Sequence, residues 1–115
     1  MTSPYIFHMC QKSLWDDALA SGFYEGGALD KQDGFIHFST AAQVRETAAR
    51  YLAGVSGLLL IKVDPEMIGD ALKWEESRDN LLFPHLYDRL SIKNVVSATE
   101  LPLGADGAHI FPDHD

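Results

Sequence analysis

Strand-like segments gather late in the chain, whereas the two longer helical patterns lie in its first half. The helices are predicted at residues 14–21 and 41–53, with a short helical turn at 66–69. A parallel sheet needs a crossover connection, usually a helix, between successive strands, and the late strands lack such connections. The order therefore favours an α+β domain with a split, strongly bent β-sheet over a doubly wound parallel sheet.

The strand predictions come from short runs rich in β-branched and aromatic residues. These runs fall at residues 5–10, 35–38, 58–63, 72–75, 82–87 and 95–101. The run at 58–63 (LLLIKV) is almost continuously apolar, so we expect it to be buried on both faces. Residues 22–33 are rich in glycine and are predicted to be irregular, and residues 76–81 to form a loop.

Candidate capping residues mark the helix starts. Ser13 is the predicted N-cap of the first helix, on which Trp15 and Leu19 are expected to share one face. Thr40 and Gln43 have the spacing of a capping box before the second helix.

The size and composition predict one domain over residues 1–103, followed by an acidic, flexible tail over residues 104–115. Cys10 is the only cysteine, so no intramolecular disulfide forms, which is typical of a reducing compartment. The N-terminus does not read as a signal peptide, and the longest apolar run, 58–61, is far shorter than a membrane span of ~20 residues. We expect a cytoplasmic protein without a membrane partner, either a monomer or a weak dimer.

The net charge is −8, and the lysines and arginines are scattered. Such a chain repels the backbone of DNA or RNA, so nucleic acid is not an expected partner. A small phosphate-bearing ligand is still compatible with this composition, because two arginines and a helix N-terminus are sufficient to hold one.

Three histidines in strand-like contexts are the most informative candidates for function. His8 lies in YIFHMC, either as a core histidine bonded to backbone or as a donor to a ligand. His37 lies in DGFIHFST, where Ser39 and Thr40 lead into a helix whose N-terminus favours anions. Its alternative role is a buried histidine beside a capping box.

The third histidine, His85, lies in LFPHLY between Phe83 and Tyr87, two aromatic side chains able to stack on a planar ligand. Glu75 and Glu76 precede this segment, and a glutamate there is able to orient an imidazole or to act as a base. The alternative for the segment around His85 is an aromatic edge strand that covers the core. The alternative for Glu75 and Glu76 is a run of charged residues exposed to solvent.

Three separated motifs follow one another along the chain: IFHMCQKSLWDDALASGFY, DGFIHFSTAAQVRETAARY and FPHLYDRL. With them, the chain resembles an uncharacterised bacterial family, domain of unknown function nine-five-two. The fold of that family is similar to the ADP-ribosyltransferase superfamily. In this resemblance IFHMC corresponds to the first-strand histidine motif and GFIHFS to a later strand that enters a helix. His85 stands where the superfamily usually has a glutamate.

The resemblance implies that NAD, or a related nucleotide, binds in a cleft of the split sheet. The first-strand histidine would hold the ribose, backbone groups beside it the carboxamide, and aromatic residues the nicotinamide. The chemistry would be nicotinamide loss through an oxocarbenium-like transition state, with Glu75 or Glu76 supplying negative charge. The expected cofactor-binding residues are His8, Met9, His37, Ser39, Thr40, Arg45, Phe83 and Tyr87. The expected catalytic residues are His8, His37, His85, Glu75 and Glu76.

Three functions remain open from the sequence. The first is an ADP-ribosyltransferase-like domain that binds NAD, with transferase or glycohydrolase activity and no metal; it predicts that the three histidines line one cleft. The second is a metal-dependent hydrolase with the three histidines as ligands. The third is a non-catalytic module that binds a peptide or a metabolite.

Overall fold

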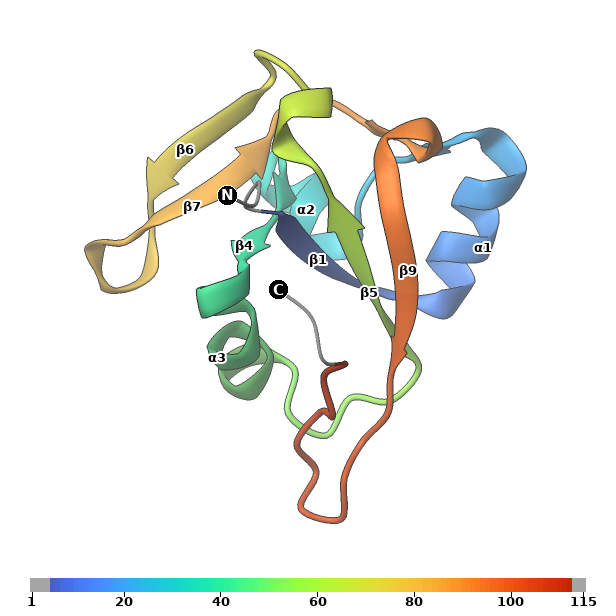
Figure 1. Cartoon of the computed structure of the whole chain (residues 1–115), viewed down its shortest axis with the longest axis vertical. Coiled ribbons are helices and arrows are strands. Elements are labelled where there is room, and N and C mark those ends of the chain that lie inside the picture. The colour runs from blue at the N-terminus through green and yellow to red at the C-terminus, as the bar shows by residue number, and fades with distance from the viewer. Residues whose placement is uncertain (1–4, 113–115) are drawn as a thin grey trace.

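Two antiparallel sheets meet at Phe38 in the computed structural model, which describes residues 5–112. The first sheet has the order β4 (Ser39–Thr40), β1 (Ile6–Gln11), β5 (Leu58–Val63) and β9 (Val95–Leu101). The second has the order β3 (Ile36–His37), β7 (Leu82–Leu86) and β6 (Leu72–Glu76). Only Phe38 separates β3 from β4, so the chain passes directly from one sheet to the other (Figure 1). Every strand pair among the described residues is antiparallel, and the predicted α+β class is confirmed.

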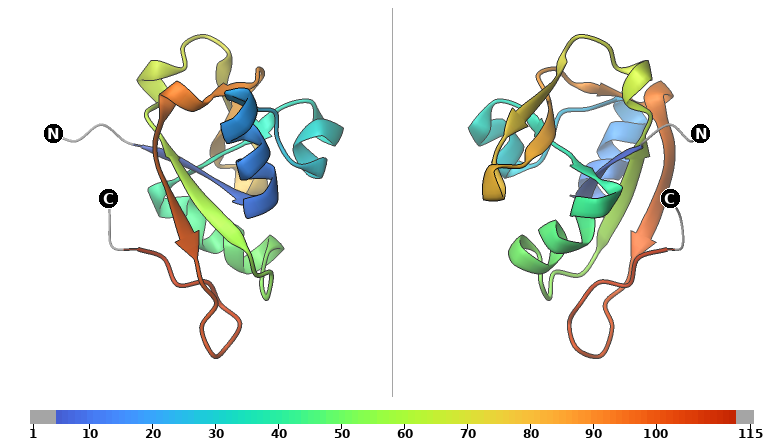
Figure 2. Two further views of the ribbon diagram at one scale, coloured as in Figure 1. Left: turned by 90° about the vertical axis from the view of Figure 1, so that its right-hand side faces the viewer. Right: turned by 60° about the vertical axis from the view of Figure 1, so that its left-hand side comes forward.

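The remaining elements are short and surround these sheets. They are the helices α1 (Lys12–Ser21), α2 (Ala28–Asp33) and α3 (Ala41–Tyr51), with 3-10 turns at Pro65–Met67, Arg78–Asn80 and Ile92–Asn94. A third, two-stranded sheet pairs β2 (Phe23–Tyr24) with β8 (Leu90–Ser91). Helices α1 and α3 lie on opposite sides of the four-stranded sheet (Figures 1 and 2).

Alternation along β1 and β5 divides the core between these two helices. Because successive strand residues point to opposite faces, Ile6 and Ile61 pack on the side of α1, in the cluster that contains Trp15. Phe7 and Leu60 pack on the other side, with Val44 of α3. The prediction that segment 58–63 is buried on both faces is confirmed.

The start and the buried face of the first helix differ from the prediction. Helix α1 begins at Lys12, directly after β1, and its N-cap is Gln11 rather than Ser13. The Lys12 N–H donates to the Gly57 carbonyl at 2.9 Å, which fixes this early start through a tertiary contact. Trp15 is buried together with Ala18, whereas Leu19 is 55% exposed, because the helix turns its i, i+3 face to the sheet.

The N-terminus of α3 agrees with its capping signal. The Thr40 N–H donates to Gln43 Oε1 at 3.0 Å, as the capping-box spacing predicts. The helix itself is shorter than expected and ends at Tyr51, which is exposed.

Residues 22–33 are more ordered than the sequence predicted, because they contain β2 and the six-residue helix α2. The helix is too short to show a periodic apolar stripe. A buried carboxylate holds it instead: Asp30 accepts a hydrogen bond from the Gly27 N–H at 2.7 Å. Gly26 has φ 98°, and a Cβ there would lie 2.6 Å from the Cβ of Asp30, so this position requires glycine.

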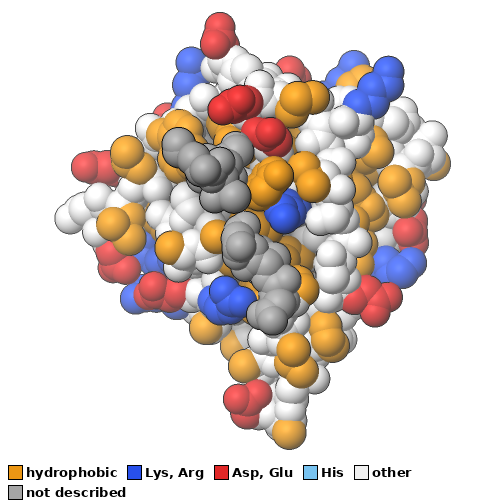
Figure 3. All heavy atoms as spheres, viewed as in Figure 1, with side chains coloured by type: hydrophobic (Ala, Val, Ile, Leu, Met, Phe, Trp, Pro, Cys, Tyr) orange, Lys and Arg blue, Asp and Glu red, His pale blue; other side chains and the backbone are white. Residues whose placement is uncertain are grey.

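Residues 104–112, in the segment expected to be a flexible tail, fold back towards α3. His109 pairs with Leu103, and the Phe111 ring packs on the Phe7 side of the core under the Arg45 guanidinium at 5.1 Å. Residues 113–115 lie outside the described residues. None of the described helices has the length and apolar character that crossing a bilayer requires. Figure 3 shows acidic and basic side chains scattered singly or in small groups over one face.

Candidate functional site

A cavity of about 370 Å³, here called the histidine pocket, lies where the two sheets, α2 and α3 meet. His8 reaches it from β1, His37 from β3 and His85 from β7. The prediction that these three side chains line one cleft is therefore confirmed. Met9, Ser39 and Phe83, which were also expected at the site, are further lining residues, and helix α3 contributes Thr47, Tyr51 and Leu52.

The imidazole of His8 is buried and has a partner at each nitrogen. Nδ1 lies 2.6 Å from the His37 carbonyl oxygen, which only accepts, so Nδ1 carries the proton and donates. Nε2 then accepts from the Tyr24 hydroxyl at 2.7 Å. Burial lowers the pKa of His8, although the carboxylate of Asp30 lies only 3.7 Å from Nε2. His8 is therefore a neutral, rigidly oriented ring at the pocket wall.

His37 is held as a cation between two carboxylates. Its Nδ1 lies 2.6 Å from Asp30 Oδ1, and its Nε2 lies 2.9 Å from Asp33 Oδ2. Burial opposes the charge, but the hydrogen bonds to Asp30 and Asp33 outweigh it and raise the pKa of His37. Both ring N–H groups are used within the protein, so His37 positions its neighbours rather than exchanging protons.

Asp30 organises this part of the site, although the sequence did not single it out. It is buried, and it accepts from the Gly27 N–H, the His37 N–H at 3.0 Å and the His37 ring. Burial alone would raise its pKa, but these hydrogen bonds, above all the one from the His37 ring, lower it. The sequence signal was weak, since Asp30 is one acid in a glycine-rich segment predicted to be irregular.

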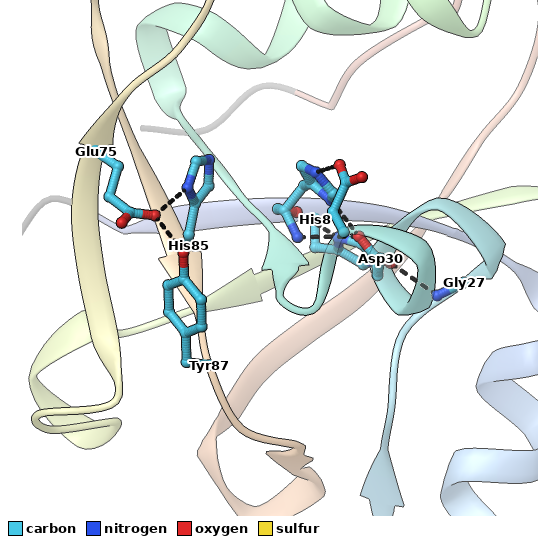
Figure 4. Close-up of polar contacts among 8 residues, drawn as sticks. His8, Gly27, Asp30, Glu75, His85 and Tyr87 are labelled. Carbon is cyan, nitrogen blue, oxygen red and sulfur yellow. Dashed lines mark hydrogen bonds and ion pairs between the residues drawn. The ribbon is translucent and has the colours of Figure 1, made fainter.

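His85, Glu75 and Tyr87 form a second polar cluster, separate from the cluster around His8 and Asp30 (Figure 4). Glu75 Oε1 accepts from His85 Nδ1 at 2.8 Å and from the Tyr87 hydroxyl at 2.7 Å. Both hydrogen bonds lower the pKa of Glu75, and the bond to this carboxylate raises the pKa of Tyr87. The Phe35 ring stacks on His85 with centroids 4.1 Å apart. Glu75 thereby orients His85 and leaves its Nε2 without a hydrogen-bond partner in the described part of the chain.

Arg78 is a pocket residue that the sequence analysis counted only as one of the scattered cations. Its side chain is 9% exposed, and its guanidinium lies 5.0 Å from the Phe83 ring centre and 5.7 Å from that of Tyr51. Within residues 5–112 the buried Nε has no hydrogen-bond partner, and the nearest carboxylate oxygen, of Asp79, is 4.0 Å away. A buried hydrogen-bond donor without an acceptor is rare in folded proteins.

The structure does not bring every predicted residue to the histidine pocket. Arg45 covers Phe111, and Thr40 is the N-cap of α3. Tyr87 lines a neighbouring hollow with Phe35, and Glu76 is exposed at the end of β6. Glu75 reaches the pocket only through its hydrogen bond to His85.

The three histidines of the pocket are poorly placed to bind a metal ion. All ring nitrogens of His8 and His37 have partners within the protein, so of the six imidazole nitrogens on the three rings one, Nε2 of His85, has no partner among the residues that the structure describes. Over residues 5–112, no group of three or more histidine, cysteine, aspartate or glutamate side chains is arranged to hold a metal ion. Cys10 is buried, and burial raises the pKa of its thiol to about 12, so it is not a reactive nucleophile.

The comparisons with known proteins confirm the family of unknown function that the sequence motifs predicted. Residues 9–98 match the family described as "Protein of unknown function (DUF952)". The chain is similar to the X-ray structure of protein CC0527 from Caulobacter crescentus, with 42% identity over 92% of this chain and 93% of that chain, and a TM-score of 0.89. The solution NMR structure of CC0527 matches with 43% identity over 90% of each chain and a TM-score of 0.82. No curated protein matches.

Proposed function

This chain belongs to the DUF952 family of proteins of unknown function, and we propose that its histidine pocket binds a nucleotide-type small molecule, with NAD as the candidate ligand. The observation that carries the proposal is the convergence of His8, His37 and His85, from three distant segments, on one cavity. A cavity with mostly apolar walls and a few convergent polar groups is the usual form of a small-molecule site.

The fold gives the proposal a second support. The first-strand histidine and the strand that enters a helix lie side by side, because β1 pairs with β4 and His8 donates to the His37 carbonyl. This juxtaposition supports the proposal because it places the two histidine-bearing strands at one wall of the pocket. The aromatic rings of Tyr51 and Phe83 supply faces for a planar base or for nicotinamide.

Hydrolysis of NAD would need a base for water rather than a metal. In the reaction, the bond between C1′ and the nicotinamide nitrogen breaks and its electron pair leaves with neutral nicotinamide. Water forms the new C–O bond at C1′ and transfers a proton to His85 Nε2. In this scheme His85 is the general base, and Glu75 is a positioning residue that holds Nδ1 and stabilises the imidazolium. Transfer to an acceptor hydroxyl would follow the same course.

Binding without turnover is the second candidate, and one observation favours it. Glu75 does not line the pocket, and the nitrogens of His8 and His37 are all engaged, so few groups are left to stabilise a developing oxocarbenium ion. Nicotinamide release, measured by chromatography after incubation with NAD, separates the two candidates. Turnover that His85→Gln abolishes supports catalysis, and binding with no release supports the binding module.

Thermal unfolding in the presence of NAD tests the proposal itself. A ligand at 100 times its dissociation constant adds about 2.7 kcal/mol of stability, which corresponds to a rise in Tm of about 10 °C for a domain of this size. His8→Gln should reduce the NAD-induced rise relative to its own ligand-free Tm. His109→Gln is a matched control, because His109 binds the Val55 carbonyl outside the pocket. No rise at millimolar NAD in the wild-type protein would refute NAD as the ligand.

A further inference from the structure

Arg78 defines a subsite within the histidine pocket, and we propose that this subsite binds one anionic group, a phosphate or a carboxylate, of the bound ligand. The inference deepens the proposed function and rests on it, because it assigns the anion to the same small molecule. It also limits the ligand class, since a neutral nucleoside or a free base has no anionic group to accept hydrogen bonds from Arg78.

The burial of Arg78 is the first observation. Its side chain is more than nine-tenths buried, and the Nε–H lies out of contact with solvent without an acceptor. Removing a guanidinium from water is unfavourable unless its donors are satisfied. Arginine presents its N–H groups as a planar fork that matches two oxygens of a carboxylate or phosphate. An anion in the pocket would supply the missing acceptor.

Contacts within the protein restrict the orientation of Arg78. Its guanidinium lies near the rings of Tyr51 and Phe83, which restrict its movement from α3 and from β7. The turn that carries it has two successive non-glycine residues with φ 60°, Asp79 and Asn80. Asp and Asn adopt left-handed backbone more readily than other non-glycine residues, and two such residues in succession give this turn a defined conformation.

The charges around the pocket leave Arg78 available. His37 is the other cationic side chain among the lining residues described, and carboxylates bind both of its N–H groups. Asp79 lies 4.0 Å from Arg78, which is too far for a hydrogen bond, and its carboxylate is 52% exposed and also faces Arg50 at 3.6 Å. An exposed carboxylate in such a contact contributes little. One guanidinium without a hydrogen-bonded carboxylate is suited to one anionic group.

Calorimetric titration of the full chain with matched ligands tests the subsite. Adenosine and AMP, or nicotinamide riboside and its 5′-phosphate, differ only in the phosphate. We expect the phosphorylated member of a pair to bind at least about tenfold more tightly. Inorganic phosphate and acetate, used as competitors, distinguish a phosphate subsite from a carboxylate subsite by which of them displaces the ligand.

Substitutions of Arg78 test whether this side chain causes the preference for the phosphorylated ligand. Arg78→Gln should abolish the difference between the members of a pair, and Arg78→Lys should retain part of it, because lysine keeps the charge but not the fork. Arg89→Gln is the matched control, since Arg89 lies 3.7 Å over the Phe23 ring but does not line the histidine pocket. The wild-type comparison needs no variant, so it remains decisive if Arg78→Gln fails to fold.

The outcomes separate this inference from the proposed function. Equal affinity of wild-type protein for AMP and adenosine, or an unchanged phosphate preference in Arg78→Gln, overturns the Arg78 subsite and leaves nucleotide binding intact. Binding of inorganic phosphate or acetate that Arg78→Gln abolishes, without any binding of nucleosides or NAD, supports the subsite and refutes the nucleotide proposal. An absence of binding by every one of these ligands refutes both.

Discussion

Replacing Asp30 by alanine should destabilise the fold far more than any surface aspartate would. The substitution removes the acceptor for three donors: the Gly27 N–H, the His37 N–H and the His37 Nδ1–H, at 2.7, 3.0 and 2.6 Å. Leaving a buried donor unsatisfied costs about 1–3 kcal/mol, and the partly exposed His37 ring can recover one bond from water. We therefore expect a loss of about 3 kcal/mol in the free energy of unfolding.

Asp33→Ala is the matched control for this substitution. Asp33 binds the same histidine, at Nε2, but its side chain is 36% exposed, and an ion pair at such a site contributes about 1 kcal/mol or less. Urea unfolding followed by tryptophan fluorescence measures the free energy of unfolding of both variants, since Trp15 of α1 is buried in the core. The reasoning is refuted if the two variants lose the same stability within about 0.5 kcal/mol, which is the usual scatter for surface changes.

The remaining predictions concern pH and the groups around Asp30. The raised pKa of His37 means that its contribution to stability is complete below pH 6.5, its ordinary pKa, and is lost as the pH rises through the folded-state value; His37→Gln should flatten the alkaline side of a stability–pH curve. The lowered pKa of His8 acts in the opposite sense, so its contribution is complete above pH 6.5 and is lost as the pH falls towards the folded-state value; His8→Gln should flatten the acid side. Tyr24→Phe removes the hydroxyl that bonds His8 Nε2 and should cost about 1 kcal/mol in urea unfolding, and no measurable loss would contradict a stabilising hydrogen bond between these two groups. Gly26→Ala combines φ 98° with a 2.6 Å clash against Asp30 and should lower stability by about 2 kcal/mol, whereas Gly54→Ala, with open space around it, should cost less in the same assay.

Local patterns accounted for most of the strands and for the position of the histidines within them. Runs of β-branched and aromatic residues predicted β1, β5, β7 and β9 to within about two residues, because strand propensity and burial act on neighbouring positions. Which face of the first helix is buried could not be predicted from these local patterns. Leu19 and Ala18 are both apolar, and only the docking of α1 on the sheet decides that Ala18 is the buried one.

By itself, the sequence determined the α+β class, the DUF952 family and the three histidines that line the pocket, because motif order and alternation are properties of the chain. Only the tertiary structure decided which charged side chains lie beside these histidines in the pocket. Asp30 and Arg78 are unremarkable in sequence, since their importance comes from burial, and burial depends on how α2 and the β6–β7 turn pack against the sheets. The same packing turned Arg45, the arginine expected at the site from the sequence, away from the pocket and onto Phe111.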